Sequence, residues 1–108
     1  AKRIEHRVSG ADANPYLVVA SILAGIHYGI IQNIEPPKIS TGDAILKHKP
    51  SLPMTWVKSL DAFSKSKILK KYFGKEFCHV YYKTKYKEMK KFDSHITPLE
   101  LDWYLRTV

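Results

Sequence analysis

The most apolar run of the chain covers residues 16–31, where the few polar side chains mark no single polar face. A helix that is apolar on all sides is normally buried on all sides. Asp12 or Asn14 can cap its start, and Pro15 suits the first helical position. The pattern therefore predicts a buried helix over residues 16–31.

A short alternating segment precedes this run, with the sequence Arg-Ile-Glu-His-Arg-Val at residues 3–8. Successive side chains of a strand point to opposite faces, so Arg3, Glu5 and Arg7 would share one face. Ser9-Gly10 breaks the pattern. We expect one short strand near the N-terminus.

The remaining pattern predicts a long connection followed by helices. Prolines and Thr41-Gly42-Asp43 exclude a long regular element from residues 33–53. Further helices are expected from Thr55, over Ser66–Phe73 and Lys75–Phe92, and after Thr97, where Pro98 and Glu100 complete a start signal. The predicted fold class is thus mostly α with one short N-terminal strand.

Length and charge narrow the class of protein. A chain of 108 residues is at most one small domain. The 18 Lys and Arg residues exceed the 10 Asp and Glu residues, which gives a formal charge of +8. This balance favours anionic partners, although a solvated lysine-rich face would give the same composition. Cys78 is the single cysteine, which suits a reducing compartment, and we expect a cytoplasmic protein.

The apolar run is not expected to meet a membrane. It is shorter than the roughly 20 residues that a span needs, and it contains Gly25 and His27. Glu5 and Asp12 do not suit the basic region of a signal peptide. His27 is expected to be a core residue rather than a metal ligand, and the five histidines show no metal-ligand spacing.

Arg3, Glu5 and Arg7 are the constellation that suggests chemistry. Guanidinium groups bind carboxylates and phosphates through a planar fork, and a glutamate oxygen suits Mg²⁺ or Mn²⁺. Together they fit the transfer of a phosphoryl group to a carboxylate. A solvent-facing strand with ion pairs would look the same.

Tyrosines and lysines interleave at residues 81–87, as on surfaces that bind single-stranded nucleic acid. The same tyrosines have helical packing spacing, with the lysines between them facing water. Nucleic acid is therefore not the expected partner.

Residues 3–31 carry a resemblance. Arg-Ile-Glu-x-Arg, a small-residue turn, Ala-Asn-Pro-Tyr-Leu and an apolar helix resemble the C-terminal part of the glutamine synthetase family. Residues 5–20 and the closing residues 97–108 look most similar to its γ-glutamylpolyamine (γ-glutamylputrescine) synthetase branch. The resemblance implies a fragment of an α+β catalytic barrel domain: a barrel strand and buried helix at 1–35, a proline-rich connecting loop at 36–54 and a C-terminal helical subdomain at 55–108.

The resemblance also implies a role for each residue of the constellation. Arg3 would contact the phosphates of ATP, Glu5 would ligate Mg²⁺ or Mn²⁺, and Arg7 would be catalytic, holding glutamate and its developing γ-phosphate. The family reaction phosphorylates the γ-carboxylate of glutamate with ATP, and an amine then displaces the phosphate.

Family members have several hundred residues, so the resemblance implies a C-terminal fragment that is inactive on its own. No cofactor is expected to bind tightly to this chain alone. Its partners would be the rest of the synthetase chain and the neighbouring subunits of a ring-forming homo-oligomer. The alternative is a small basic helical binding module, acting on nucleic acid or co-assembling with a full-length synthetase.

Overall fold

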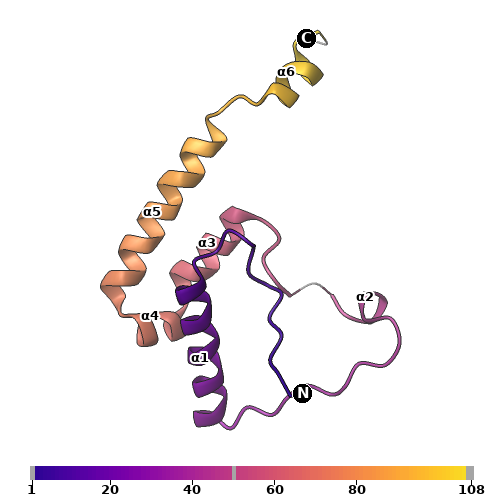
Figure 1. Cartoon of the computed structure of the whole chain (residues 1–108), viewed down its shortest axis with the longest axis vertical. Helices are drawn as coiled ribbons and strands as arrows, with labels where there is room; N and C mark the ends of the chain where they lie inside the picture. The colour runs from indigo at the N-terminus through magenta and orange to yellow at the C-terminus, as the bar shows by residue number, and fades with distance from the viewer. Residues whose placement is uncertain (1, 50, 107–108) are drawn as a thin grey trace. The chain divides into compact units, whose positions relative to one another are not determined.

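The computed structural model describes residues 2–49 and 51–106, and within these ranges every regular element is a helix. The chain divides into two compact units, residues 1–49 and 50–108 (Figure 1). In chain order the helices are α1 (Pro15–Ile31), α2 (Ala44–Lys47), α3 (Trp56–Lys65), α4 (Lys67–Phe73), α5 (Lys75–Asp93) and α6 (Pro98–Tyr104). The predicted mostly helical class is confirmed.

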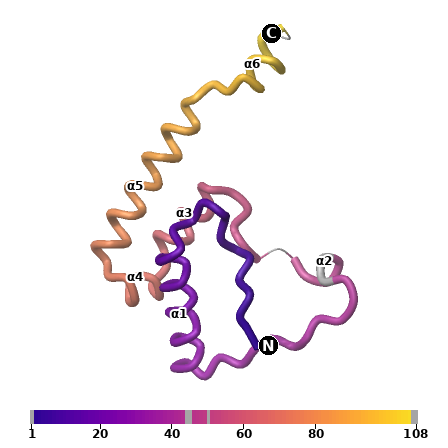
Figure 2. The backbone as a smooth tube through the Cα atoms, in the orientation of Figure 1, coloured from indigo at the N-terminus to yellow at the C-terminus, as the bar shows by residue number. Residues whose placement is uncertain are grey.

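The short N-terminal strand is not found among these residues. Residues 2–7 form no helix or strand and run as an open trace in Figure 2. A strand requires backbone hydrogen bonds to a neighbouring strand, and the described ranges supply no such neighbour. The alternation at residues 3–8 is therefore present without the pairing that defines a strand.

α1 begins where the sequence predicts, and its cap is Asn14 rather than Asp12. The Asn14 side-chain oxygen accepts hydrogen bonds from the backbone N–H groups of Tyr16, at 3.0 Å, and Leu17, at 3.2 Å. These bonds satisfy two of the N–H groups that a helix start leaves unpaired. Pro15 lies in the first turn, where the missing N–H costs nothing.

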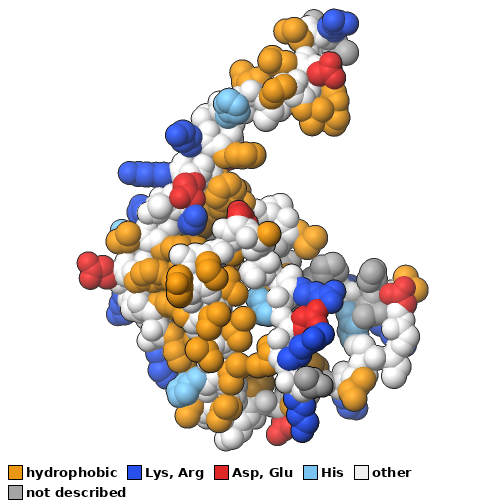
Figure 3. Space-filling view, viewed as in Figure 1, with side chains coloured by type: hydrophobic (Ala, Val, Ile, Leu, Met, Phe, Trp, Pro, Cys, Tyr) orange, Lys and Arg blue, Asp and Glu red, His pale blue; other side chains and the backbone are white. Residues whose placement is uncertain are grey.

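α1 exposes much of its apolar surface. Ala24 is its one buried residue, whereas Val19 is 55 % and Leu23 is 60 % exposed. Figure 3 shows apolar side chains at the surface in the region of this helix. His27, expected in a core, is exposed because nothing in the described ranges covers the helix on all sides. Of the helices in those ranges, none has both the length and the apolar content that a bilayer span requires.

The proline-containing stretch after α1 contains one short helix, which lies within the first unit. α2 forms a single turn, so the prediction that no long regular element occupies residues 33–53 is confirmed for residues 33–49 and 51–53. The Lys47 ammonium group donates to the backbone oxygen of Thr41, and Ser40 Oγ lies 2.8 Å from His48 Nε2. His48 thus contacts a hydroxyl group in the loop.

α3, α4 and α5 form the core of the second unit. Phe63 packs on Tyr81 with ring centroids 5.2 Å apart, and Trp56 meets Phe92 at 6.3 Å. Because the start of α3 meets the end of α5, the two helices are antiparallel. The buried side chains of this unit within the described residues are Leu60, Cys78 and Met89.

Local sequence signals determine where the helices of this unit begin and where the chain turns. Thr55 Oγ1 accepts from the backbone N–H of Lys58 at 3.3 Å, and Ser66 Oγ accepts from that of Leu69 at 3.1 Å. Gly74 separates α4 from α5 with φ of +84°. Side chains disfavour this backbone region, so glycine suits the turn.

α6 begins with the predicted capping box. The Thr97 backbone N–H donates to Glu100 Oε2 at 2.7 Å, and the Glu100 backbone N–H donates to Thr97 Oγ1 at 3.2 Å. The hydrogen bonds from Thr97 hold the pKa of the Glu100 carboxyl group below its ordinary value. The charged carboxylate therefore stabilises the start of α6.

This lowered pKa predicts a pH-dependent α6. A carboxyl group whose pKa is lower when folded stabilises the fold above the unfolded pKa, and that stabilisation is lost as pH falls through the folded pKa. We expect amide protection in α6 to decrease as the pH falls below the ordinary pKa of a glutamate carboxyl group. Hydrogen exchange read by NMR measures it. Glu100→Gln should flatten this dependence and Asp102→Asn should leave it; the reverse order would contradict the capping role.

Candidate functional site

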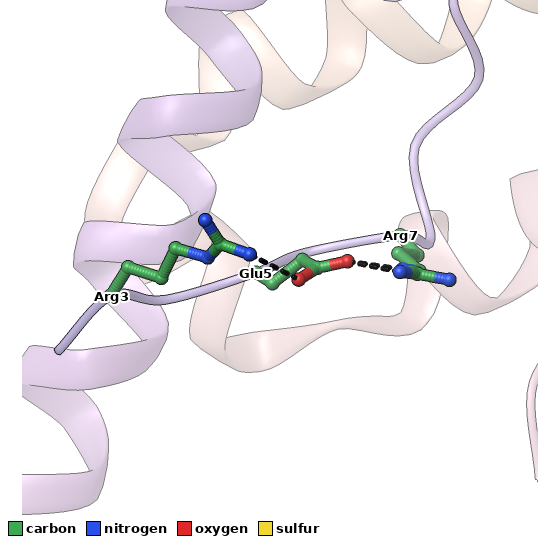
Figure 4. A network of polar contacts seen from close by, with 3 residues as sticks. All are labelled: Arg3, Glu5 and Arg7. Atoms are coloured by element: carbon green, nitrogen blue, oxygen red, sulfur yellow. Dashed lines mark hydrogen bonds and ion pairs between the residues drawn. The ribbon is translucent and has the colours of Figure 1, made fainter. Parts of the chain in front are cut away.

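Arg3, Glu5 and Arg7 lie together on the open segment before α1. Figure 4 shows the Glu5 carboxylate between the two guanidinium groups. Arg7 Nε donates to Glu5 Oε1 at 2.5 Å, and Arg7 Nη2 also contacts that oxygen. Arg3 Nη2 lies 3.8 Å from Glu5 Oε2. The structure thus brings together the three residues that the alternating pattern placed on one face.

The side chains that form these ion pairs are exposed to solvent. The side chains of Arg3 and Arg7 are 79 % and 85 % exposed, and that of Glu5 is 48 % exposed. Exposed ion pairs contribute about 0–1 kcal/mol each, so separating them costs little. Both guanidinium groups are therefore available to an anion that offers several oxygens, such as a phosphate or a carboxylate.

Glu5 fits a divalent cation as one ligand of several. Its carboxylate is a hard oxygen donor, which is the kind that Mg²⁺ and Mn²⁺ prefer. No group of three or more His, Cys, Asp and Glu side chains that could hold a metal ion is found in residues 2–49 and 51–106. The remaining ligands of a cation at Glu5 would have to come from outside these residues.

The tyrosines of residues 81–87 contact other aromatic rings of the helical unit. Tyr81 contacts the rings of Phe63 and Phe77, and Tyr82 stacks on Tyr86 with centroids 6.1 Å apart. Rings that pack on one another in this way form part of the fold. Their arrangement supports the packing interpretation of this run.

A groove between α4 and α5 was not predicted from the sequence. Lysines of both helices line it, and Lys70 and Lys75 had no assigned role. One signal was present on α5, where Lys75, His79 and Lys83 recur every four residues. The α4 residue in the groove, Lys70, gave no such signal, because its place beside α5 depends on the turn at Gly74.

Comparison with known proteins assigns the part of the chain that includes Arg3, Glu5 and Arg7 to a protein family. Residues 1–104 match the family described as glutamine synthetase, catalytic domain. The chain is 38 % identical to the γ-glutamylputrescine synthetase PuuA of Escherichia coli over 104 residues, or 96 % of this chain and 22 % of the relative.

Other relatives share this coverage. The type-1 glutamine synthetase 2 of Dictyostelium discoideum is 34 % identical over all of this chain and 22 % of its own length. The glutamate–isopropylamine ligase of a Pseudomonas species is 37 % identical over 97 % of this chain and 24 % of its own length. The chain thus spans less than a quarter of these relatives, and no solved structure matches it significantly. With nearly all of its length matched, the chain belongs to the glutamine synthetase family.

Proposed function

We propose that this chain forms one wall of the active site of an ATP-dependent glutamate–amine ligase. The observation that carries the proposal is the carboxylate of Glu5 held between the guanidinium groups of Arg3 and Arg7, within a segment matched to a catalytic domain. Two cations and one hard oxygen ligand suit a reaction between two anions, ATP and a carboxylate.

Each side chain has a proposed role. Arg3 binds the nucleotide phosphates, and Glu5 is one ligand of Mg²⁺ or Mn²⁺. The metal ion, when bound, neutralises charge on the phosphates. Arg7 holds the glutamate substrate and the charge that develops on its γ-carboxylate as the phosphoryl group arrives, because its planar fork matches such oxygens.

The proposed reaction has two steps. The γ-carboxylate of glutamate takes the terminal phosphoryl group of ATP and releases ADP. An amine then attacks the carboxyl carbon of this γ-glutamyl phosphate, the C–O bond to phosphate breaks, and an amide, inorganic phosphate and a proton result. We propose a polyamine such as putrescine as the amine, because the relative named for putrescine is 38 % identical to this chain.

The same proposal accounts for the uncovered surfaces of the first unit. We propose that residues 1–35 contribute a barrel strand and a helix to the catalytic domain, with residues 2–7 pairing with strands outside this chain. Further parts of the domain would cover the exposed apolar face of α1, since such a surface favours burial. Residues 36–54 are then the connection, and residues 55–108 a helical subdomain in a ring-forming homo-oligomer.

A graft tests the proposal. This chain replaces the matching segment of the Escherichia coli γ-glutamylputrescine synthetase, and phosphate release is measured with ATP, Mg²⁺, glutamate and putrescine. We expect turnover, and we expect none from the 108-residue chain alone because it supplies one proposed metal ligand. A graft that assembles to the parent's size without turnover would overturn the proposal, as would turnover by the isolated chain.

A further inference from the structure

The second unit contains a basic groove where α4 and the first half of α5 meet. The described residues that line it are Ser64, Lys70, Lys75, Cys78, His79, Tyr82 and Lys83. Among the described residues that line it there is no Asp or Glu. The groove therefore concentrates positive charge from two helices in one concave surface, in a different unit from Arg3, Glu5 and Arg7.

The α5 side of the groove has a regular spacing. Lys75, His79 and Lys83 lie four residues apart, which puts them on one face of the helix. Lys75 and Lys83 carry the charge of this face and lie eight residues apart. In the part of the chain that the structure describes, the ion pairs found involve none of the lysines of the groove.

On the α4 side of the groove, the charged group is the ammonium group of Lys70, and its position is fixed by a hydrogen bond. The Lys70 ammonium group donates to the backbone oxygen of Ser64, and its side chain is half-buried. An ammonium group has three protons, so two remain for another acceptor. Tyr82 stacks on Tyr86, and it is one of the residues that line the same groove.

We propose that this groove binds a chain of phosphate groups, such as an oligophosphate or a nucleoside triphosphate carries. Three ammonium groups spread over two helices match an anion whose several charges extend along a chain. A lone carboxylate carries one charge, whereas linked phosphates carry one or more for each of Lys70, Lys75 and Lys83. The site is separate from the proposed active-site wall and does not depend on the ligase proposal.

The test is an NMR titration of the ¹⁵N-labelled 108-residue chain with inorganic tripolyphosphate and, separately, with ATP at low salt. Amide shifts should concentrate at residues 70–83. The double variant Lys75→Gln/Lys83→Gln should bind tripolyphosphate about tenfold more weakly. The matched control Lys58→Gln/Lys87→Gln makes the same change of charge on helical lysines outside the groove, and should weaken binding less than twofold.

The outcomes are distinct. Equal affinity for the two probes would assign recognition to the phosphate chain, and tighter binding of ATP would add a contact between the base and the Tyr82 ring. Equal losses in the two double variants would overturn the proposal, because binding would then follow net charge alone. Shifts confined to residues 2–8 would also overturn it, since they report on Arg3 and Arg7. Circular dichroism checks that both variants keep their helices.

Discussion

Replacing Arg7 by alanine should lower kcat of the grafted ligase by about 100-fold to 1000-fold, the usual cost of removing one donor aimed at developing charge. Arg7 has an exposed guanidinium group whose contact with Glu5 is a solvent-screened ion pair. It can turn toward a substrate at little cost. The charge that it meets grows as the γ-carboxylate is phosphorylated, so the loss should fall on kcat more than on KM.

Two further variants sharpen this test. Arg7→Lys keeps the charge and loses the planar fork, so its kcat should lie between those of the parent graft and Arg7→Ala. Arg106→Ala removes an arginine outside the matched residues 1–104 and should leave kcat unchanged. A rise in KM at constant kcat for Arg7→Ala would show that this residue contributes to ground-state binding alone.

Features that depend on neighbouring residues were predicted well from the sequence. A cap before Pro15 was predicted at Asp12 or Asn14, and Asn14 forms it. That cap, the capping box of Thr97 and Glu100 and the stop at Gly74 all follow from groups within a few residues of one another. Such contacts form whatever the rest of the protein does. The proximity of Arg3, Glu5 and Arg7 belongs to the same class, since their spacing alone allows them to meet.

Features that need partners far away in the sequence could not be predicted from local patterns. An alternating segment becomes a strand only beside another strand, and residues 2–7 meet none in the described ranges. The exposed apolar residues of α1 likewise require a surface that these ranges do not supply. The groove between α4 and α5 was not predicted. Lys70 of α4 lines it because of the turn at Gly74, and a repeat in the sequence does not reveal that placement.

Leu60→Ala should lower the free energy of unfolding of the second unit by about 2–3 kcal/mol. Leu60 is 7 % exposed on α3, and it is one of few buried side chains in a small helical unit. Small domains have little stability to lose, so this is a large fraction of the total. Urea denaturation followed by circular dichroism at 222 nm measures the change.

Val57→Ala is the matched control for this prediction. Val57 lies one turn before Leu60 on α3 and is 60 % exposed, so its truncation leaves almost no cavity, and alanine favours the helix. Its effect should stay within about 0.5 kcal/mol. Met89→Ala on α5 removes another buried side chain and should follow Leu60→Ala rather than the control. Equal effects of Leu60→Ala and Val57→Ala would show that packing of α3 on α5 does not hold this unit together.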